Sequence, residues 1–170
     1  MVGPEPAPRP SGPSSEAEVS AALRAMALQV GADDLGLDQD DPDRVHGVLM
    51  ELGHAQHVVT TVALLDGTAS RYVSSGGGTV GAGEHETVAE AARSLVAMAQ
   101  VLMGLTEPVS QFPLPTAGRA HFHLLTAGGG RTVGAFVDEL EDRRHALAPL
   151  YESGRALSSR IDELGENQRG

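Results

Sequence analysis

The chain has 170 residues, of which 41% are hydrophobic but only 3% aromatic, so its core must be built mainly from aliphatic side chains. Its 23 acidic and 12 basic residues give a net charge of -11, which argues against partners such as nucleic acids and anionic membranes that attract basic surfaces. Every basic residue is Arg and there is no Cys, which excludes lysine-based phosphate loops, Schiff bases, thiolate chemistry and disulfides.

Membrane and export signals are not apparent in the sequence. No apolar run approaches the ~20 residues that a membrane-spanning helix needs. The first fifteen residues lack the basic and apolar regions of a signal peptide. We therefore expect a cytoplasmic protein without a membrane span.

Two segments precede the main body of the chain. Residues 1–14 hold five of the ten prolines and predict a disordered tail, because they offer too little apolar surface to bury. Residues 15–31 predict an N-terminal amphipathic helix, in which Ser15 and Glu18 form a capping box. Its apolar residues recur at helical spacing: Val19, Leu23, Met26 and Val30.

Residues 32–41 are strongly acidic and predict a solvated linker. Their Asp spacing does not match an EF-hand, which requires a central Gly and a terminal Glu in register. Asp41 followed by Pro42 is typical of a helix start, with Asp as the cap and Pro in the first turn. We expect this helix to end at Gly53 and to present one apolar face: Val45, Val48, Leu49 and Leu52.

A β-hairpin and a long helix are expected next. Gln56–Leu65 is rich in Val and Thr and predicts a strand, Asp66-Gly67 is a strong hairpin turn signal, and Thr68–Ser74 is the returning strand. After a run of glycines, Glu84–Met103 predicts an Ala-rich helix that can approach a sheet closely.

The remaining elements complete an α+β domain. Val109–Leu114 predicts a short strand, Arg119–Thr126 and Arg131–Val137 predict a second hairpin, and Ala146–Leu164 predicts the last helix, followed by a tail at 165–170. The two hairpins indicate a mostly antiparallel, five-stranded sheet with helices packed on it. The expected order is helix-strand-strand-helix-strand-strand-strand-helix, after the extra N-terminal helix.

The segment Gly76–Glu84, with sequence GGGTVGAGE, joins a strand to a helix start, where phosphates often bind. It fails the Walker pattern because no Lys follows, and it fails the dinucleotide pattern because the strand before it belongs to a hairpin. We expect a structural turn or a contact surface for a protein partner. The candidate partner-binding residues are Gly76, Gly77, Gly78, Gly81, Glu84 and His85, together with Arg143 and Arg144, the densest basic spot.

The seven His residues raise a metal hypothesis. His121 and His123 share one face of a strand, and His85 would have to converge on them to make a zinc site. His85-Glu86 begins like a zincin motif, but Ala89 stands where the second His is needed. Scattered surface His residues are the simpler interpretation, so we expect neither a metal, nor a cofactor, nor a catalytic residue.

The element order from residue 42 to 164 resembles the roadblock (dynein light chain) superfamily, a relative of longin and profilin-like folds. The features that carry the resemblance are Asp41-Pro42, the Asp66-Gly67 hairpin, the helix Glu84–Met103 and the helix Ala146–Leu164. The resemblance implies a non-enzymatic homodimer that binds or regulates small GTPases.

These observations together predict a protein-interaction module, namely a dimeric scaffold or regulator of a small GTPase. Two alternatives stay open. The first is an acidic, chaperone-like binder of a secreted or assembly partner, since small acidic α+β proteins also resemble such chaperones. The second is a metal-dependent enzyme built on the His cluster.

Overall fold

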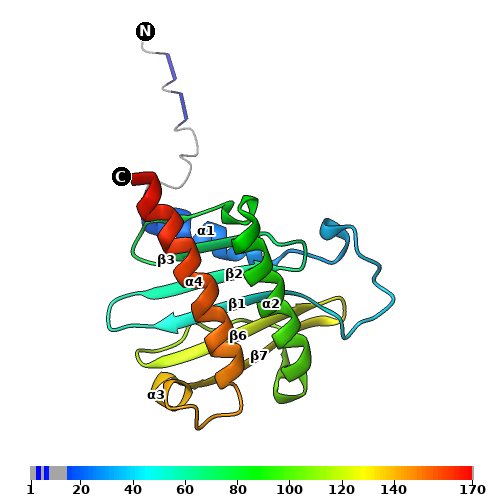
Figure 1. Ribbon diagram of the computed structural model, residues 1–170. Helices are drawn as coiled ribbons and strands as arrows, with labels where there is room; N and C mark the ends of the chain where they lie inside the picture. Colours follow the sequence, from blue (N-terminus) through cyan, green and yellow to red (C-terminus); the bar gives the residue numbers. More distant parts are fainter. Residues whose placement is uncertain (1–2, 5, 8–14, 170) are drawn as a thin grey trace.

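A computed structural model describes residues 3–4, 6–7 and 15–169 of the chain. It has an α+β fold, in which a seven-stranded antiparallel sheet has the order β4-β3-β2-β1-β6-β7-β5 (Figure 1). The strands are β1 Val45–Gly53, β2 Val58–Leu64, β3 Ala69–Val73, β4 Gly78–Thr79, β5 Glu107–Val109, β6 Arg119–Thr126 and β7 Gly129–Phe136. The α-helices are α1 Glu16–Leu28, α2 Glu86–Leu102, α3 Val137–Glu141 and α4 Ala148–Arg169.

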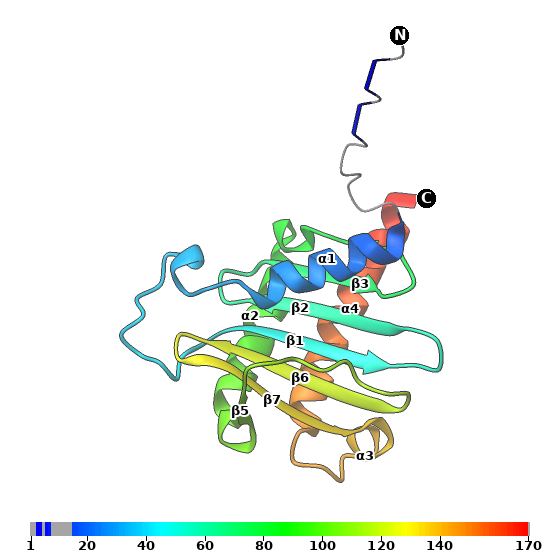
Figure 2. The same cartoon turned by 180° about the vertical axis from the view of Figure 1, so that it is seen from behind.

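The two faces of the sheet are covered differently. Helices α2 and α4 lie side by side across one face (Figure 1), and they also pack against each other. The opposite face carries α1 over β2 and β3, and the chain after β5 crosses it further along (Figure 2). We call this crossing segment, residues 110–117, the strap. The sheet is therefore the middle layer of three.

Each face of the sheet has its own apolar core. The larger core, between the sheet and the pair α2–α4, includes Phe122, the largest fully buried side chain. The smaller core lies under α1 and the strap and contains five buried side chains: Leu49, Val62, Leu64, Tyr72 and Leu125. Because β1 is central, all nine of its residues are buried.

The prediction of a helix that ends at Gly53 is wrong, because Val45–Gly53 forms the central strand β1. Its apolar residues satisfy a helical period, but a strand buried on both faces also reads as a continuous apolar run. Asp41 does not cap a helix; its carboxylate accepts a hydrogen bond from the backbone N–H of Asp43, at 3.0 Å, in a turn. The chain enters β1 from that turn.

The expected five-stranded sheet is also too small. The structure adds β1 and the two-residue edge strand β4, which pairs with β3. Of the expected strand Val109–Leu114, only its first residue is in a strand, since β5 ends at Val109 and the strap follows. Pro113 and Pro115 lack the N–H groups that a continued ladder requires. Four strands, β1 to β4, therefore lie between α1 and α2 in the chain, where two were expected.

Other expected elements are confirmed. Strands β2 and β3 form the first hairpin around Gly67, whose φ of 93° is a backbone conformation that suits glycine. The second forms by β6 and β7. Helices α1, α2 and α4 occupy the three expected helical regions, and α4 continues to Arg169 through most of the expected tail. The predicted N-terminal tail lies mostly outside the described residues.

Within the described part of the chain, one helical stretch, Glu86–Leu105, is long and apolar enough to cross a membrane by length and composition. Its apolar stripe packs on the sheet and belongs to the larger core. This packing agrees with the expectation of a chain without a membrane span.

The strap passes so close to the end of β1 that Gly53 has no room for a side chain. A Cβ there would overlap the carbonyl oxygen of Thr116. We expect Gly53→Ala to lower the free energy of unfolding by about 1–3 kcal/mol, as overpacking of a rigid site does. Gly104→Ala is the matched control, since no atom lies within 4 Å of its added Cβ. Urea unfolding curves measure both, and equal stabilities would contradict the close approach.

Candidate functional site

A buried ion-pair network lies on the α1 face of the sheet. Glu51, on the central strand β1, has a fully buried side chain and accepts two hydrogen bonds from the guanidinium of Arg24 on α1, at 2.6 and 2.9 Å. The other side of the carboxylate contacts His123 Nε2 at 3.0 Å and the Thr60 hydroxyl at 2.9 Å. We call Arg24, Glu51, Thr60 and His123 the buried network.

The buried network extends to β7 and to the strap. His123 Nδ1 lies 2.8 Å from the hydroxyl oxygen of Thr132 on β7. Arg24 Nη2 also donates to the backbone carbonyl of Phe112 at 2.8 Å, and the Phe112 ring meets His123 edge-on, with centroids 5.1 Å apart. Four strands, one helix and the strap are thus joined through Glu51 and the side chains that contact it.

The ionisation of Glu51 follows from this setting. Burial alone would raise its pKa, but hydrogen bonds and charge interactions with Arg24 and His123 outweigh burial and lower the pKa from 4.5 to about 2. Burial, with the nearby Glu51 charge, raises the pKa of the Tyr72 phenol, which stays neutral and donates to the carbonyl of Leu23 on α1 at 3.3 Å.

Glu51, His123 and Thr132 stand in the order of an acid–histidine–hydroxyl triad, but their contacts favour a structural role. A catalytic carboxylate orients and stabilises its histidine, whereas Glu51 is also neutralised by two hydrogen bonds from Arg24. The side chain of His123 is fully buried, and the Thr132 hydroxyl also contacts the carbonyl of Phe122 at 3.3 Å. This geometry holds strands together, because each carboxylate oxygen of Glu51 contacts two partners within the buried network.

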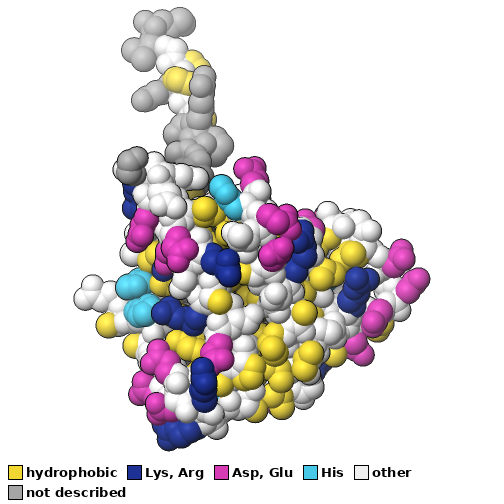
Figure 3. All heavy atoms as spheres, in the orientation of Figure 1, with side chains coloured by type: hydrophobic (Ala, Val, Ile, Leu, Met, Phe, Trp, Pro, Cys, Tyr) yellow, Lys and Arg dark blue, Asp and Glu magenta, His cyan; other side chains and the backbone are white. Residues whose placement is uncertain are grey.

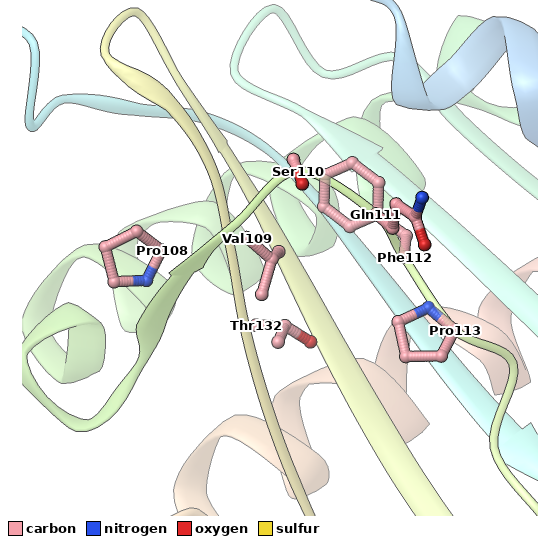
Figure 4. Close-up of a pocket in the computed structure, with 7 residues that line it drawn as sticks. All are labelled: Pro108, Val109, Ser110, Gln111, Phe112, Pro113 and Thr132. Carbon is pink, nitrogen blue, oxygen red and sulfur yellow. The ribbon is translucent and has the colours of Figure 1, made fainter.

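A shallow depression of about 600 Å³ opens beside the buried network, between the strap and β7 (Figure 4). Thr132 rises from β7 on one side, and Phe112 and Pro113 of the strap lie across from it (Figure 4). Among the residues that the structure describes, those that line it carry no charge: Pro108, Val109, Ser110, Gln111, Phe112, Pro113 and Thr132. A surface of this kind suits an uncharged or polypeptide contact better than a small ionic ligand.

Two smaller cavities border α1. One, of about 160 Å³, lies along Ser20 and Arg24, and the other, of about 240 Å³, lies toward Val19 and the glycine segment. Tyr72 lines both of them. Helix α1 is therefore packed with gaps on the sheet.

The predicted partner-binding residues do not form a single surface. The glycine segment lies at the β3–β4 edge, where Gly77 and Gly78 line the larger of the two cavities beside α1, and His85 precedes the first turn of α2. Arg143 and Arg144 lie between α3 and α4, at the other end of the molecule from that segment (Figure 1). Arg143 pairs with Glu152 at 2.6 Å, and Arg144 pairs with Asp142 at 2.8 Å.

The His residues are not gathered into a metal site. The described residues contain no group of three or more His, Asp or Glu side chains positioned to hold a metal ion. His121 contacts the carbonyl of Pro113 at 2.9 Å, His123 belongs to the buried network, and His85 lies at the start of α2.

The C-terminal half of α2 presents an uncharged outer surface. No charged residue occurs from Ser94 to Thr106, in a chain of which 21% is charged. The Val101 side chain is 77% exposed and Leu105 is 47% exposed. Figure 3 shows hydrophobic side chains gathered over this end of α2. We call Ala97 and Val101 of α2, together with Leu105 of the short 3-10 turn Met103–Leu105 that follows it, the α2 patch.

Sequence reasoning missed the buried network entirely. Glu51 was hidden within an expected amphipathic helix, where a single Glu between Met50 and Leu52 reads as a solvent-facing residue. One signal was available: Glu51 is the only charged residue from Val45 to Gln56, and Arg24 is the only one from Val19 to Ala32. Opposite charges isolated in apolar segments are candidates for a buried pair.

Comparisons with known proteins add no further assignment. No model of a known protein family matches the chain, and neither a curated protein nor a solved structure is significantly similar to it.

Because its pKa is low, Glu51 contributes to the stability of the fold in a way that changes over a defined range of pH. A carboxyl with a folded pKa of about 2 and an ordinary value of 4.5 stabilises the fold above pH 4.5, and that contribution is lost as pH falls toward 2. We expect the loss to be about 3 kcal/mol. Glu51→Gln should be less stable than the native chain at pH 7 and lose less stability over this window, measured by urea unfolding at each pH.

The control for this pH series is Glu163→Gln, which removes an exposed carboxylate on α4. It should follow the native chain at every pH. A Glu51→Gln variant with the same pH dependence as the native chain would contradict the assignment.

Proposed function

We propose that this protein is a non-enzymatic protein-interaction module that works as a homodimer. The observation that carries the proposal is the α2 patch, an apolar surface on an otherwise strongly acidic molecule. Exposed apolar surface of this kind marks a contact with another protein more often than it marks a catalytic site.

A second copy of the chain is the proposed occupant of the α2 patch. Two copies of a net charge of -11 repel each other, so the contact must lie where charge is absent, as it is from Ser94 to Thr106. A helix pair around Ala97 and Val101 can approach closely because Ala is small. A stable dimer would bury about 1,200–2,000 Å² in total, which requires neighbouring residues of α2 and α4 as well as the patch.

The partner of the dimer is proposed from the sequence. The resemblance to the roadblock superfamily suggests a small GTPase, although the strand β1 occupies the region where the resemblance placed a helix. The alternative is a chaperone-like binder of a secreted or assembly partner. The observation that favours it is the further apolar exposure on α1, where Met26 is 67% and Val19 is 41% exposed.

Charge introduced into the α2 patch tests the dimer. We expect the native chain to be a dimer by light scattering at micromolar concentration, and Val101→Glu with Leu105→Glu to be a monomer with an unchanged circular dichroism spectrum. Thr87→Glu is the matched control, since Thr87 is exposed on the first turn of the same helix and far from the patch. A native monomer, or a dimer that survives the double substitution, would refute this surface.

The partner class is tested by a pull-down from native lysate in the presence of GDP or a non-hydrolysable GTP analogue. A small GTPase retained in only one nucleotide state is the result expected of a regulator. A secreted or assembly protein retained equally in both would favour the chaperone-like alternative and reject the GTPase proposal.

A further inference from the structure

Helix α1 is held on the sheet by Arg24 and by apolar side chains that are only partly buried, which are Leu23, Ala27 and Leu28. Of its thirteen residues, only Ser20 is buried. Two cavities lie along its contact with the sheet. By contrast, α2 buries six residues, five of which belong to the larger core. The attachment of α1 therefore combines the polar contacts of Arg24 with partly buried apolar contacts, and it lacks the fully buried apolar side chains that hold α2.

The surface beneath α1 is built to receive a guanidinium. We call it the α1 groove; its apolar floor is Leu49, Val62, Leu64, Tyr72 and Leu125, with Glu51 beside them. The Glu51 side chain has no exposure and cannot remain ionised there without a cation. The strap adds a second acceptor, the carbonyl of Phe112. A planar guanidinium reaches the carboxylate and this carbonyl together, whereas a lysine ammonium is a point charge on a thin stem.

The connection between α1 and β1 first packs against the smaller core through Val30 and Leu35, and its remaining part is open to solvent. All residues from Asp38 to Arg44 are exposed, and the connection swings out beyond the edge of the helix and sheet layers (Figures 1 and 2). Separation of α1 breaks no strand pairing, because every strand lies after Arg44. The larger core does not include any residue of α1.

We propose that α1 is a built-in occupant of the α1 groove, and that an amphipathic helix of a partner polypeptide replaces it by placing an arginine on Glu51. This inference deepens the proposed interaction function and does not require the α2 patch. The replacing helix needs one Arg, apolar residues beside it and one turn further on, and few acidic residues. The net charge of -11 favours approach of a basic segment.

The chain supplies its own probe for this exchange. A fluorescently labelled peptide with the sequence of residues 15–30 should bind the full-length Arg24→Ala chain, because the peptide restores the missing guanidinium. Its Kd for the native chain should be at least about ten-fold weaker, since α1 then occupies the groove for most of the time. Anisotropy titrations measure both. Equal binding to the two chains, or no binding to either, would overturn the proposal.

Peptide and groove variants show whether the arginine decides the binding. The peptide with Ala at the position of Arg24 should bind the Arg24→Ala chain at least about ten-fold more weakly than the native peptide, and a Lys there should restore only part of the difference. In a chain that carries both Arg24→Ala and Glu51→Gln, the native and Ala peptides should bind alike. A preference for Arg that persists without Glu51 would place the binding elsewhere.

Hydrogen exchange on the native chain keeps the proposal testable if the Arg24→Ala chain folds poorly. Amides of α1 should exchange through a local opening, much faster than those of β1 and α2, which require global unfolding. In a chain whose α1 never opens, excess free peptide has no groove to enter. It should then leave the exchange rates of the β2 and β6 amides unchanged. Protection of α1 equal to that of β1 would overturn the proposal.

A second copy of the chain is the competing occupant. The Val101→Glu, Leu105→Glu chain separates the two dimer surfaces: it should remain a monomer at high concentration and still bind the peptide after Arg24→Ala is added. A dimer of this chain that Arg24→Ala abolishes would assign the groove to α1 of another copy and refute a partner helix. If the peptide does not bind while the dimer through the α2 patch is intact, the proposal for the α1 groove is refuted and the proposed dimer is not.

Discussion

The carboxylate of Glu51 on the middle strand is the constraint on which this side of the molecule depends. An isolated ionised carboxylate in an apolar layer is strongly unfavourable, and removal of one partner from a buried ion pair typically costs about 3–5 kcal/mol. Arg24, His123 and Thr60 satisfy Glu51, and each belongs to a different element. The positions of α1 and of the strap relative to the sheet are thereby fixed by electrostatics more than by shape.

The two sheet faces consequently differ in kind. On the face with α2 and α4, close contact of small and branched side chains excludes water and tolerates no exchange of elements. On the face with α1, a polar centre is bordered by two cavities, and the residues of α1 are not part of the larger core.

Local signals in the sequence predicted the hairpins and three helices, but not β1 or the buried network. The Asp66-Gly67 turn and the stripe of α2 act over short range, so their structures follow from their own residues. Val45–Gly53 has an apolar pattern that fits either a helix or a buried strand, and only its neighbours β2 and β6 decide between them. The pairing of Arg24 with Glu51 joins residues 27 positions apart, and no local pattern announces it.

Tyr72 gives the molecule an optical property that follows from its position. The chain has no Trp and only two tyrosines, and Tyr72 lines both cavities beside α1 while its hydroxyl contacts the Leu23 carbonyl. The second tyrosine, Tyr151, lies on α4 across the sheet. The near-ultraviolet emission of the native protein therefore contains one fluorophore that senses the environment of α1 and one that serves as an internal reference, without any added label.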